Sequence, residues 1–220
     1  EILMEKYYNI FYDIIEKNDS YDLIIHCAFK AQGAGKNNIN DYYKYVDDNI
    51  LLTKELTSLK HNKFVYISSI IAYSEEVSAY KYSKLFSEAI VEKTSNSPLI
   101  VRCSSLLGEA MRYNTLMKII NDETSEITLT KDSTYNFIRH SDLLEFILKA
   151  AKKDVTGVVD FVASDYIELK EVVDRLNSSV AYGSYTFKTP NASNTRLVNM
   201  FPEYNKSSWE ALGEFLEEIK

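Results

Sequence analysis

The chain of 220 residues has a formal net charge of −7, with 45% hydrophobic and 26% charged residues. This composition is ordinary for a globular protein, and the length allows one large core or one domain with a small lobe. The acidic balance argues against a nucleic-acid partner, and no apolar run approaches the ~20 residues of a membrane-spanning helix.

The first half of the chain alternates between helical and strand-like patterns. Apolar residues at helical spacing predict helices, and short, almost wholly apolar runs predict buried strands. Polar residues 30–40 predict a loop. The expected elements are a helix at 2–17, a strand at 22–29, a helix at 41–60, a strand at 64–67, a helix at 78–94 and a strand at 99–101.

The second half continues less regularly. We expect helices near 113–121, 141–152 and 168–177 and after Ser208, strands near 126–130, 135–138 and 157–162, and extended pieces over 180–198. Strands and helices that alternate with short connections favour a parallel sheet with helices on both faces. The predicted fold class is therefore α/β.

The cysteines and histidines give no sign of a disulfide or a metal site. Cys27 and Cys103 both lie in apolar runs typical of buried strands, which we interpret as small buried thiols in a reducing compartment. The three histidines are scattered and lack metal-ligand spacing, so we expect no metal.

The pattern Tyr-x-x-x-Lys occurs twice, at Tyr80–Lys84 and Tyr166–Lys170. With 17 tyrosines in the chain, chance alone supplies such spacings, so only the context is informative. The first copy follows a buried strand that ends in Ser68-Ser69, and the carboxyl ends of parallel strands are where open α/β sheets bind ligands. The second copy has no such strand before it, and we interpret it as surface.

A serine, a tyrosine and a lysine at these positions suit proton transfer. A tyrosine hydroxyl has a pKa near 10, and a nearby ammonium group favours the phenolate and brings it into a useful range. A serine hydroxyl can bind the reacting oxygen while hydride passes to or from a nicotinamide ring. The alternative, in which the serines cap a helix that carries an exposed tyrosine and lysine, stays open.

Six segments, in chain order, extend this context. The run Tyr80-Lys81-Tyr82-Ser83-Lys84 and Glu88 resembles the Tyr-x-x-Ser-Lys-x-x-x-Glu helix of extended short-chain dehydrogenase/reductases, the NAD-dependent epimerase/dehydratase group. The other matches are 21–28 (the Asp-x-Val-x-His-x-Ala strand), 45–49 with Thr53 (the helix of the framework asparagine), 64–73 (Ser-Ser-x-x-x-Tyr), 101–108 (Arg-x-x-x-x-x-Gly) and 137–143 (the later Asp-Leu signature).

The resemblance implies roles for four catalytic residues. Tyr80 would be the acid/base, and Lys84 would lower the pKa of Tyr80 and bind ribose. Ser69 would bind the reacting oxygen, and Asn49 would hold the framework. The implied cofactor-binding set is Cys27, Ala28, Lys30, Lys84 and Cys103, and the implied substrate-binding set is Ser69, Ser105 and Arg139. For Cys103, simple core packing is the competing interpretation.

Four features depart from the family pattern. No Gly-x-x-Gly-x-x-Gly turn occurs, because Gly33-Ala34-Gly35 follows a different strand, and we expect about 50 to 60 further residues before Glu1. Ile70 and Ile71 replace the Asp-Glu of the sugar-nucleotide dehydratases, which argues against dehydration. Tyr135 replaces an arginine that grips the nucleotide diphosphate, and the loop between Ser69 and Tyr80 is trimmed.

The resemblance implies a Rossmann-type sheet, with its N-terminal part missing, plus a small C-terminal α+β substrate lobe. Residues 1–110 would form the partial dinucleotide-binding domain, joined by elements from about 135–165, and 111–220 mainly the substrate lobe. We expect an NAD(P)-dependent epimerase or ketoreductase that acts on a carbonyl or carbinol carbon of a nucleotide-linked sugar. It would use NAD or NADP, if the missing segment is present, and form a cytoplasmic homodimer. The alternative is a non-catalytic binding or scaffold protein that kept the fold.

Overall fold

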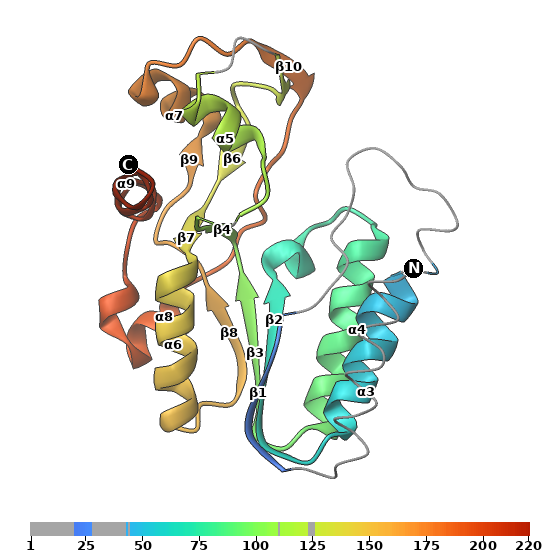
Figure 1. Ribbon diagram of the computed structural model, residues 1–220. Coiled ribbons are helices and arrows are strands. Elements are labelled where there is room, and N and C mark those ends of the chain that lie inside the picture. Colours follow the sequence, from blue (N-terminus) through green and yellow to red (C-terminus); the bar gives the residue numbers. More distant parts are fainter. Residues whose placement is uncertain (1–19, 28–42, 44, 110, 123–125) are drawn as a thin grey trace. The chain divides into compact units, whose positions relative to one another are not determined.

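The computed structural model describes residues 20–27, 43, 45–109, 111–122 and 126–220. These form two compact units (Figure 1). The first comprises the described residues of Glu1–Ser68 with Glu75–Val101 and Lys149–Val158, and the second comprises Ser69–Ser74, Arg102–Leu148 and Val159–Lys220. The predicted helix at 2–17 and loop at 30–40 lie outside the described residues. The assignment of 111–220 to substrate binding stays a prediction.

A four-stranded sheet confirms the α/β prediction. Its order is β1-β2-β3-β8, and β1 and β2 pair in parallel. The arrowheads of β2, β3 and β8 point the same way in Figure 1. All four strands were expected from the sequence; their bounds are β1 Tyr21–His26, β2 His61–Ser69, β3 Pro98–Cys103 and β8 Gly157–Phe161.

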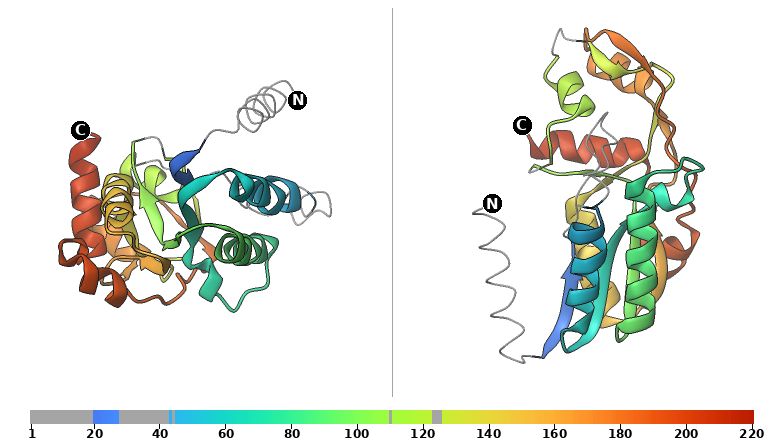
Figure 2. Two further views of the ribbon diagram at one scale, coloured as in Figure 1. Left: turned by 90° about the horizontal axis from the view of Figure 1, so that it is seen from below. Right: turned by 90° about the vertical axis from the view of Figure 1, so that its right-hand side faces the viewer.

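Two helical segments lie side by side in the first unit, as both views of Figure 2 show. One is a π-helical turn, η1 (Val46–Leu51), continued by α3 (Leu52–Ser58), and the other is α4 (Ala79–Thr94). The hydroxyl of Ser78 caps α4 by accepting a hydrogen bond from the Lys81 N–H at 3.2 Å. The helix predicted at 78–94 is confirmed, as is the one at 41–60 over its described residues.

Within each unit, residues of the sheet pack against helices. Phe64 and Tyr66 of β2 pack with Val91 of α4, and Val158 of β8 joins this cluster. In the second unit, Phe161 of β8 contacts Phe146 of α6 (His140–Lys152), with ring centroids 5.1 Å apart.

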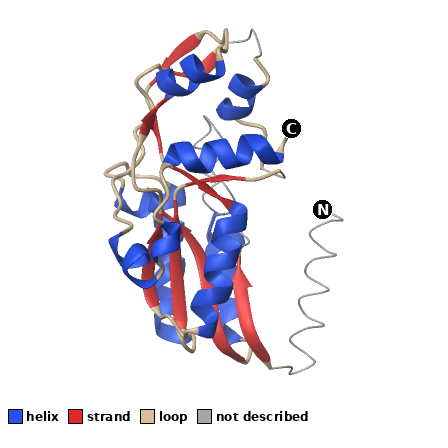
Figure 3. Cartoon of the chain, turned by 90° about the vertical axis from the view of Figure 1, so that its left-hand side faces the viewer, coloured by secondary structure: helices blue, strands red, loops and turns tan. Residues whose placement is uncertain are grey.

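The second unit mixes short strands and helices. Its strand pairs are β4–β7 and β5–β10, both parallel, and β6–β9, antiparallel. Figure 3 shows α9 packed across the β4–β7 pair. The elements are β4 Ser105–Leu107, α5 Thr115–Ile120, β5 Ile127–Leu129, β6 Thr134–Tyr135, β7 Phe137–Arg139, β9 Ile167–Glu168, α7 Leu169–Leu176, β10 Tyr182–Tyr185, α8 Thr195–Met200, η3 Pro202–Tyr204 and α9 Ser208–Glu218.

The final helix shows how the sequence sets these elements. Ser207 and Glu210 form a reciprocal capping box at its start, and each side chain accepts from the other residue's backbone N–H. Ala211, Leu212 and Phe215 then lie buried on one face, as their helical spacing requires. This face packs into the apolar core of the second unit with residues of β4, β5, β7 and α7.

The structure departs from the sequence expectations in its shortest elements. Residues 195–200 form α8, where extended chain was expected, and β4 and β9 were not anticipated. Six helical residues span fewer than two turns, and two- or three-residue strands show no alternation, so periodicity could not identify them. None of the helices in the described part of the chain combines the length and the apolarity needed to cross a membrane.

Gly183 of β10 offers a test of the packing. A Cβ atom at this position would lie 2.5 Å from the backbone oxygens of Ile127 and Thr128, which cannot move away cheaply. Gly183→Ala should therefore lower the free energy of unfolding by about 1–3 kcal/mol. Gly213 is the matched control, because it lies in α9 with open space around it, and Gly213→Ala should raise stability by about 0.5–1 kcal/mol. Urea denaturation of both variants measures the difference, and equal effects would contradict it.

Candidate functional site

A layer of buried polar side chains lies between β1, η1–α3 and α4. Each of its members is 2% exposed or less, and they are His26, Asn49, Thr53, Ser83 and Ser87. We call this set the polar layer. Buried polar groups are costly unless they form hydrogen bonds, so their partners define how the site is held together.

Asn49 is connected to the backbone of Tyr80 through Ser83. The Asn49 amide Nδ2 donates to the Ser83 hydroxyl at 3.0 Å. The same hydroxyl donates to the backbone oxygen of Tyr80 at 2.8 Å. The proposed framework asparagine therefore fixes the first turn of α4, where the proposed acid/base lies.

Two hydroxyls hold the backbone of Asn49 from the other side. Thr53 donates to the Asn49 carbonyl oxygen at 2.5 Å, and Ser87 of α4 reaches the same oxygen at 3.2 Å. Asn49 lies in the π-helical turn, and side chains that engage such a carbonyl stabilise the local widening of the helix.

His26 completes the polar layer as a neutral imidazole. Its Nε2 lies 2.9 Å from Thr53 Oγ1. Because the single Thr53 hydroxyl hydrogen goes to Asn49, Nε2 must carry the proton and donate. Nδ1 is then an acceptor, and it has no hydrogen-bond partner among the described residues. Burial, and then the charge of Lys84, lower the pKa of His26 to about 4.

Lys84 lies at the carboxyl ends of β1 and β2. It is 1% exposed, and its Nζ donates to the Ile67 carbonyl oxygen at 2.8 Å. Its charge also acts on Cys27, where partial burial raises the thiol pKa and Lys84 counteracts that rise. This is the edge of a parallel sheet at which ligands bind.

Tyr80 is half-buried in the first turn of α4, close to Tyr66. Burial is the main cause of the raised pKa of Tyr66, and the neighbouring Tyr80 and Glu88 add to it. Asn49, Tyr80 and Lys84 thus all lie in the first unit, and their catalytic roles stay predictions.

Ser69 ends β2 and begins the short helix η2 (Ile70–Tyr73). Its hydroxyl accepts from the Ile71 N–H at 3.2 Å. Within the same unit, Tyr73 donates to the Asp160 carboxylate at 2.9 Å, and the Arg102 guanidinium lies 4.8 Å from the Tyr73 ring centroid. Because Ser69 belongs to the second unit and Tyr80 to the first, the Ser-Tyr-Lys arrangement stays a prediction.

The predicted cofactor contacts have mixed outcomes. Ala28 and Lys30 lie outside the described residues. Cys103 is 3% exposed at the end of β3, as expected of a buried thiol. The buried position predicted for Cys27 is wrong, because β1 ends at His26 and Cys27 is exposed just after it. Their contacts with a cofactor stay predictions.

The predicted substrate-binding residues Ser105 and Arg139 lie on the paired strands β4 and β7. The Arg139 guanidinium forms ion pairs with Glu214 at 2.6 Å and Glu218 at 2.9 Å, both on α9. These contacts anchor α9, and a substrate would have to compete with them. The substrate-binding roles of Ser105 and Arg139 stay predictions.

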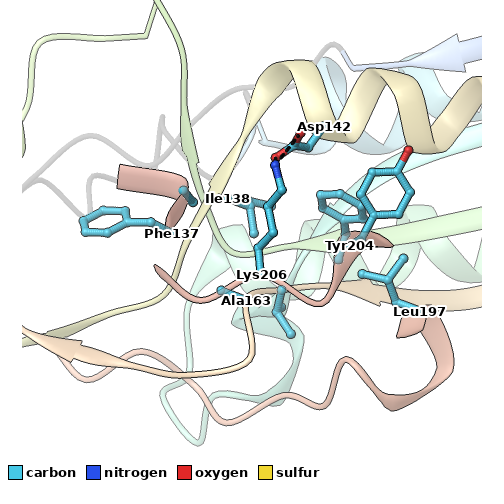
Figure 4. A pocket seen from close by; sticks show the side chains of 10 residues that line it. Phe137, Ile138, Asp142, Ala163, Leu197, Tyr204 and Lys206 are labelled. Carbon is cyan, nitrogen blue, oxygen red and sulfur yellow. Dashed lines mark hydrogen bonds and ion pairs between the residues drawn. The ribbon is translucent and has the colours of Figure 1, made fainter. Parts of the chain in front are cut away.

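A small hollow in the second unit does not serve as the substrate site. It has room for about 20 Å³, enough for roughly one water molecule. Figure 4 shows the Lys206 amino group pointing at the Asp142 carboxylate, and their closest atoms are 3.1 Å apart. Lys206 also pairs with Glu214 at 2.7 Å, so this cluster joins α6 to α9.

The second Tyr-x-x-x-Lys copy is structural. The Tyr166 hydroxyl accepts from the Ala192 N–H at 2.9 Å, and Lys170 pairs with Asp174 on the surface. Lys170 is exposed, as predicted, and Tyr166 is half-buried at the surface, where it holds the chain at 190–192. In the described ranges, no three histidine, cysteine or acidic side chains group to hold a metal ion.

The sequence analysis gave no role to most of the polar layer or to Tyr66. One available signal was the four-residue spacing of small polar residues, Asn49 with Thr53 and Ser83 with Ser87, which places each pair on one helix face. Two such helices packed on one buried strand predict a layer of buried polar side chains.

Comparisons with known proteins identify the family of the chain. A family model described as "NAD dependent epimerase/dehydratase family" matches residues 10–163. No curated protein matches the chain significantly.

Solved structures of nucleotide-sugar enzymes share the fold. The dTDP-4-dehydrorhamnose reductase of Bacillus anthracis, in complex with NADP, has a TM-score of 0.75 and 20% identity over 96% of this chain and 84% of that chain. The UDP-glucuronic acid 4-epimerase of Bacillus cereus, with UDP-glucuronic acid and NAD, has a TM-score of 0.70 and 18% identity over 90% and 76%. The UDP-N-acetylglucosamine 4-epimerase of Bacillus cereus has a TM-score of 0.70 and 20% identity over 93% and 79%.

Burial of neutral His26 predicts a loss of stability in acid. The folded-state pKa of about 4 lies below the ordinary 6.5, so the unfolded chain takes up the proton first as the pH falls. Lowering the pH from 7 to 5 should therefore reduce the free energy of unfolding by about 2 kcal/mol through this residue. His26→Gln, which can still donate to Thr53, should lose that pH dependence in denaturation curves at both pH values. An unchanged difference between the two pH values would contradict the assignment.

Proposed function

Because the chain belongs to the NAD dependent epimerase/dehydratase family, a family of NAD-dependent enzymes, we propose that it is an NAD(P)-dependent epimerase or ketoreductase. Its substrate would be a carbonyl or carbinol carbon of a nucleotide-linked sugar. The supporting observation is the connected set in the first unit: Asn49 is joined to the Tyr80 backbone through Ser83, and the buried Lys84 lies one turn along α4.

The described residues fit the nicotinamide–ribose end of such a cofactor. Lys84 provides an ammonium group at the carboxyl ends of β1 and β2 and would donate to the ribose hydroxyls. Cys27, exposed directly after β1, would line the same edge. The printed sequence has no glycine-rich phosphate turn, so no residue is assigned to the pyrophosphate. Bound NAD(P) would supply a ring that accepts and returns hydride.

The side chains would divide the proton chemistry between them. Tyr80 would take the proton from the carbinol oxygen or return it to the carbonyl oxygen, and the Lys84 charge would favour the phenolate that this requires. Ser69 accepts from the Ile71 N–H, which leaves its hydroxyl hydrogen to donate to the same substrate oxygen. Asn49 would hold the first turn of α4 in place.

The segment after Ser69 supports oxidation–reduction without dehydration. Ile70 is 4% exposed in η2, and Ile71 follows it. Neither side chain can move a proton. Elimination of water needs an acid and a base beside the reacting carbon, and η2 supplies neither at these positions.

Nucleotide sugars are proposed as substrates because the structural neighbours act on them. Their names include a UDP-sugar 4-epimerase and a dTDP-sugar reductase, so both carriers and both outcomes belong in a substrate screen. We further propose a cytoplasmic homodimer. Tyr82 and Phe86 of α4 are 43% and 60% exposed and lie four residues apart, which supports a helical contact face.

Tyr80→Phe should separate chemistry from binding. Removal of the hydroxyl should reduce kcat by about 10²–10⁴-fold and leave the Kd for NAD(H) or NADP(H) nearly unchanged. Lys84→Ala should weaken cofactor binding, measured by nicotinamide fluorescence with the native full-length polypeptide. Tyr185→Phe, which removes an exposed hydroxyl from β10, is the control and should behave as the wild type.

Two results would count against this proposal. If the native protein bound neither cofactor, a cofactor-free binding or scaffold role would be the better account. If Tyr80→Phe kept full turnover of a confirmed nucleotide-sugar substrate, the assignment of the acid/base would be wrong.

A further inference from the structure

Lys84 is a buried cation on which the proposed chemistry depends. It is 1% exposed, and desolvation favours the neutral amine over the ammonium ion. The proposed reaction needs the ammonium ion, because only its charge favours the Tyr80 phenolate. Some neighbouring group must therefore compensate for the lost hydration and hold Nζ in place.

The aromatic ring of Tyr66 lies in the right position to do so. Lys84 Nζ is 4.8 Å from the ring centroid, inside the ~6 Å range of an attractive contact between a cation and a ring face. The next residue of β2 supplies a second contact, since Nζ donates to the Ile67 carbonyl oxygen at 2.8 Å. Tyr66 is itself 1% exposed, and such contacts are strongest where water is excluded.

Resting on the proposed function, we infer that Tyr66 is a positioning residue for the reaction. The face of its ring holds the Lys84 ammonium ion charged and directed, so that Lys84 can act on Tyr80. Tyr66 does not touch the substrate in this scheme and acts through Lys84 alone.

Several titratable groups lie near Lys84. His26, at the end of β1, stays neutral because its pKa is lowered to about 4, and partial burial raises the pKa of the Cys27 thiol that follows it. From α4, the Glu88 carboxylate accepts from the Ser68 hydroxyl at 2.5 Å, and Tyr80 is the group to be activated. Burial also raises the pKa of Tyr66, so Tyr66 contributes a ring face and not a phenolate charge.

The test separates the ring from the hydroxyl. Tyr66→Phe keeps the ring face and loses only the hydroxyl, whereas Tyr66→Leu loses the ring. The acid limb of the kcat/KM pH profile reports the formation of the Tyr80 phenolate. In Tyr66→Phe this limb should stay within a few tenths of a pH unit. In Tyr66→Leu the limb should move up by about one pH unit. At pH values below the limb, kcat/KM should then be about tenfold lower than in the wild type, and at high pH it should recover.

A second series covers the case in which Tyr66→Leu fails to fold. Increasingly fluorinated phenylalanines at position 66 keep the size of the ring and weaken the negative face that attracts the cation. The acid limb should then move up step by step with fluorination, while cofactor-free thermal stability stays within a narrow range. A purely structural ring would give no such graded shift in the pH profile.

The outcomes distinguish the two proposals. An active wild type whose acid limb is the same in every fluorinated variant would overturn the role of Tyr66 and leave the proposed function standing. A wild type that neither binds cofactor nor turns over a nucleotide sugar would overturn both. A graded shift in an active enzyme would support both.

Discussion

The burial of one charged side chain, Lys84, governs the structure around the site. A buried ammonium ion is stable only if neighbouring dipoles and rings replace its hydration. β2 supplies the Ile67 carbonyl oxygen and the Tyr66 ring, and His26 nearby stays neutral. The Thr53 hydroxyl, whose hydrogen goes to the Asn49 carbonyl oxygen, then accepts from His26 Nε2 and joins β1 to the rest of the polar layer.

The sequence predicted the large elements and the residues in the first unit that come together. Strands β1, β2, β3 and β8 and helices α4, α6, α7 and α9 follow from apolar patterning, because each is long enough to show a period or a buried run. The combination of strand end and helix start predicted that Ser69, Tyr80 and Lys84 lie close together, and the family resemblance added Asn49. The first of these inferences needs only the topology of a parallel sheet.

The remaining features depend on three-dimensional contacts that no local pattern carries. Cys27 was expected to be buried because the apolar run continues past it, yet β1 ends one residue earlier. Arg139 looked available to a ligand, but its ion-pair partners, Glu214 and Glu218, lie far along the chain on α9. The contact between the Tyr66 ring and Lys84 likewise joins a strand and a helix whose relative register is a tertiary property.

The π-helical turn at 46–51 changes which residues share one face of the helix that contains Asn49. A regular α-helix has 3.6 residues per turn, so residues spaced by four drift slowly around its axis. Yet Tyr45, Asn49, Thr53 and Thr57, at strict four-residue spacing, are all buried. The wider π turn offsets the drift and keeps this stripe facing α4. In this helix the number of residues in the turn, together with their identity, therefore decides which side chain meets Ser83.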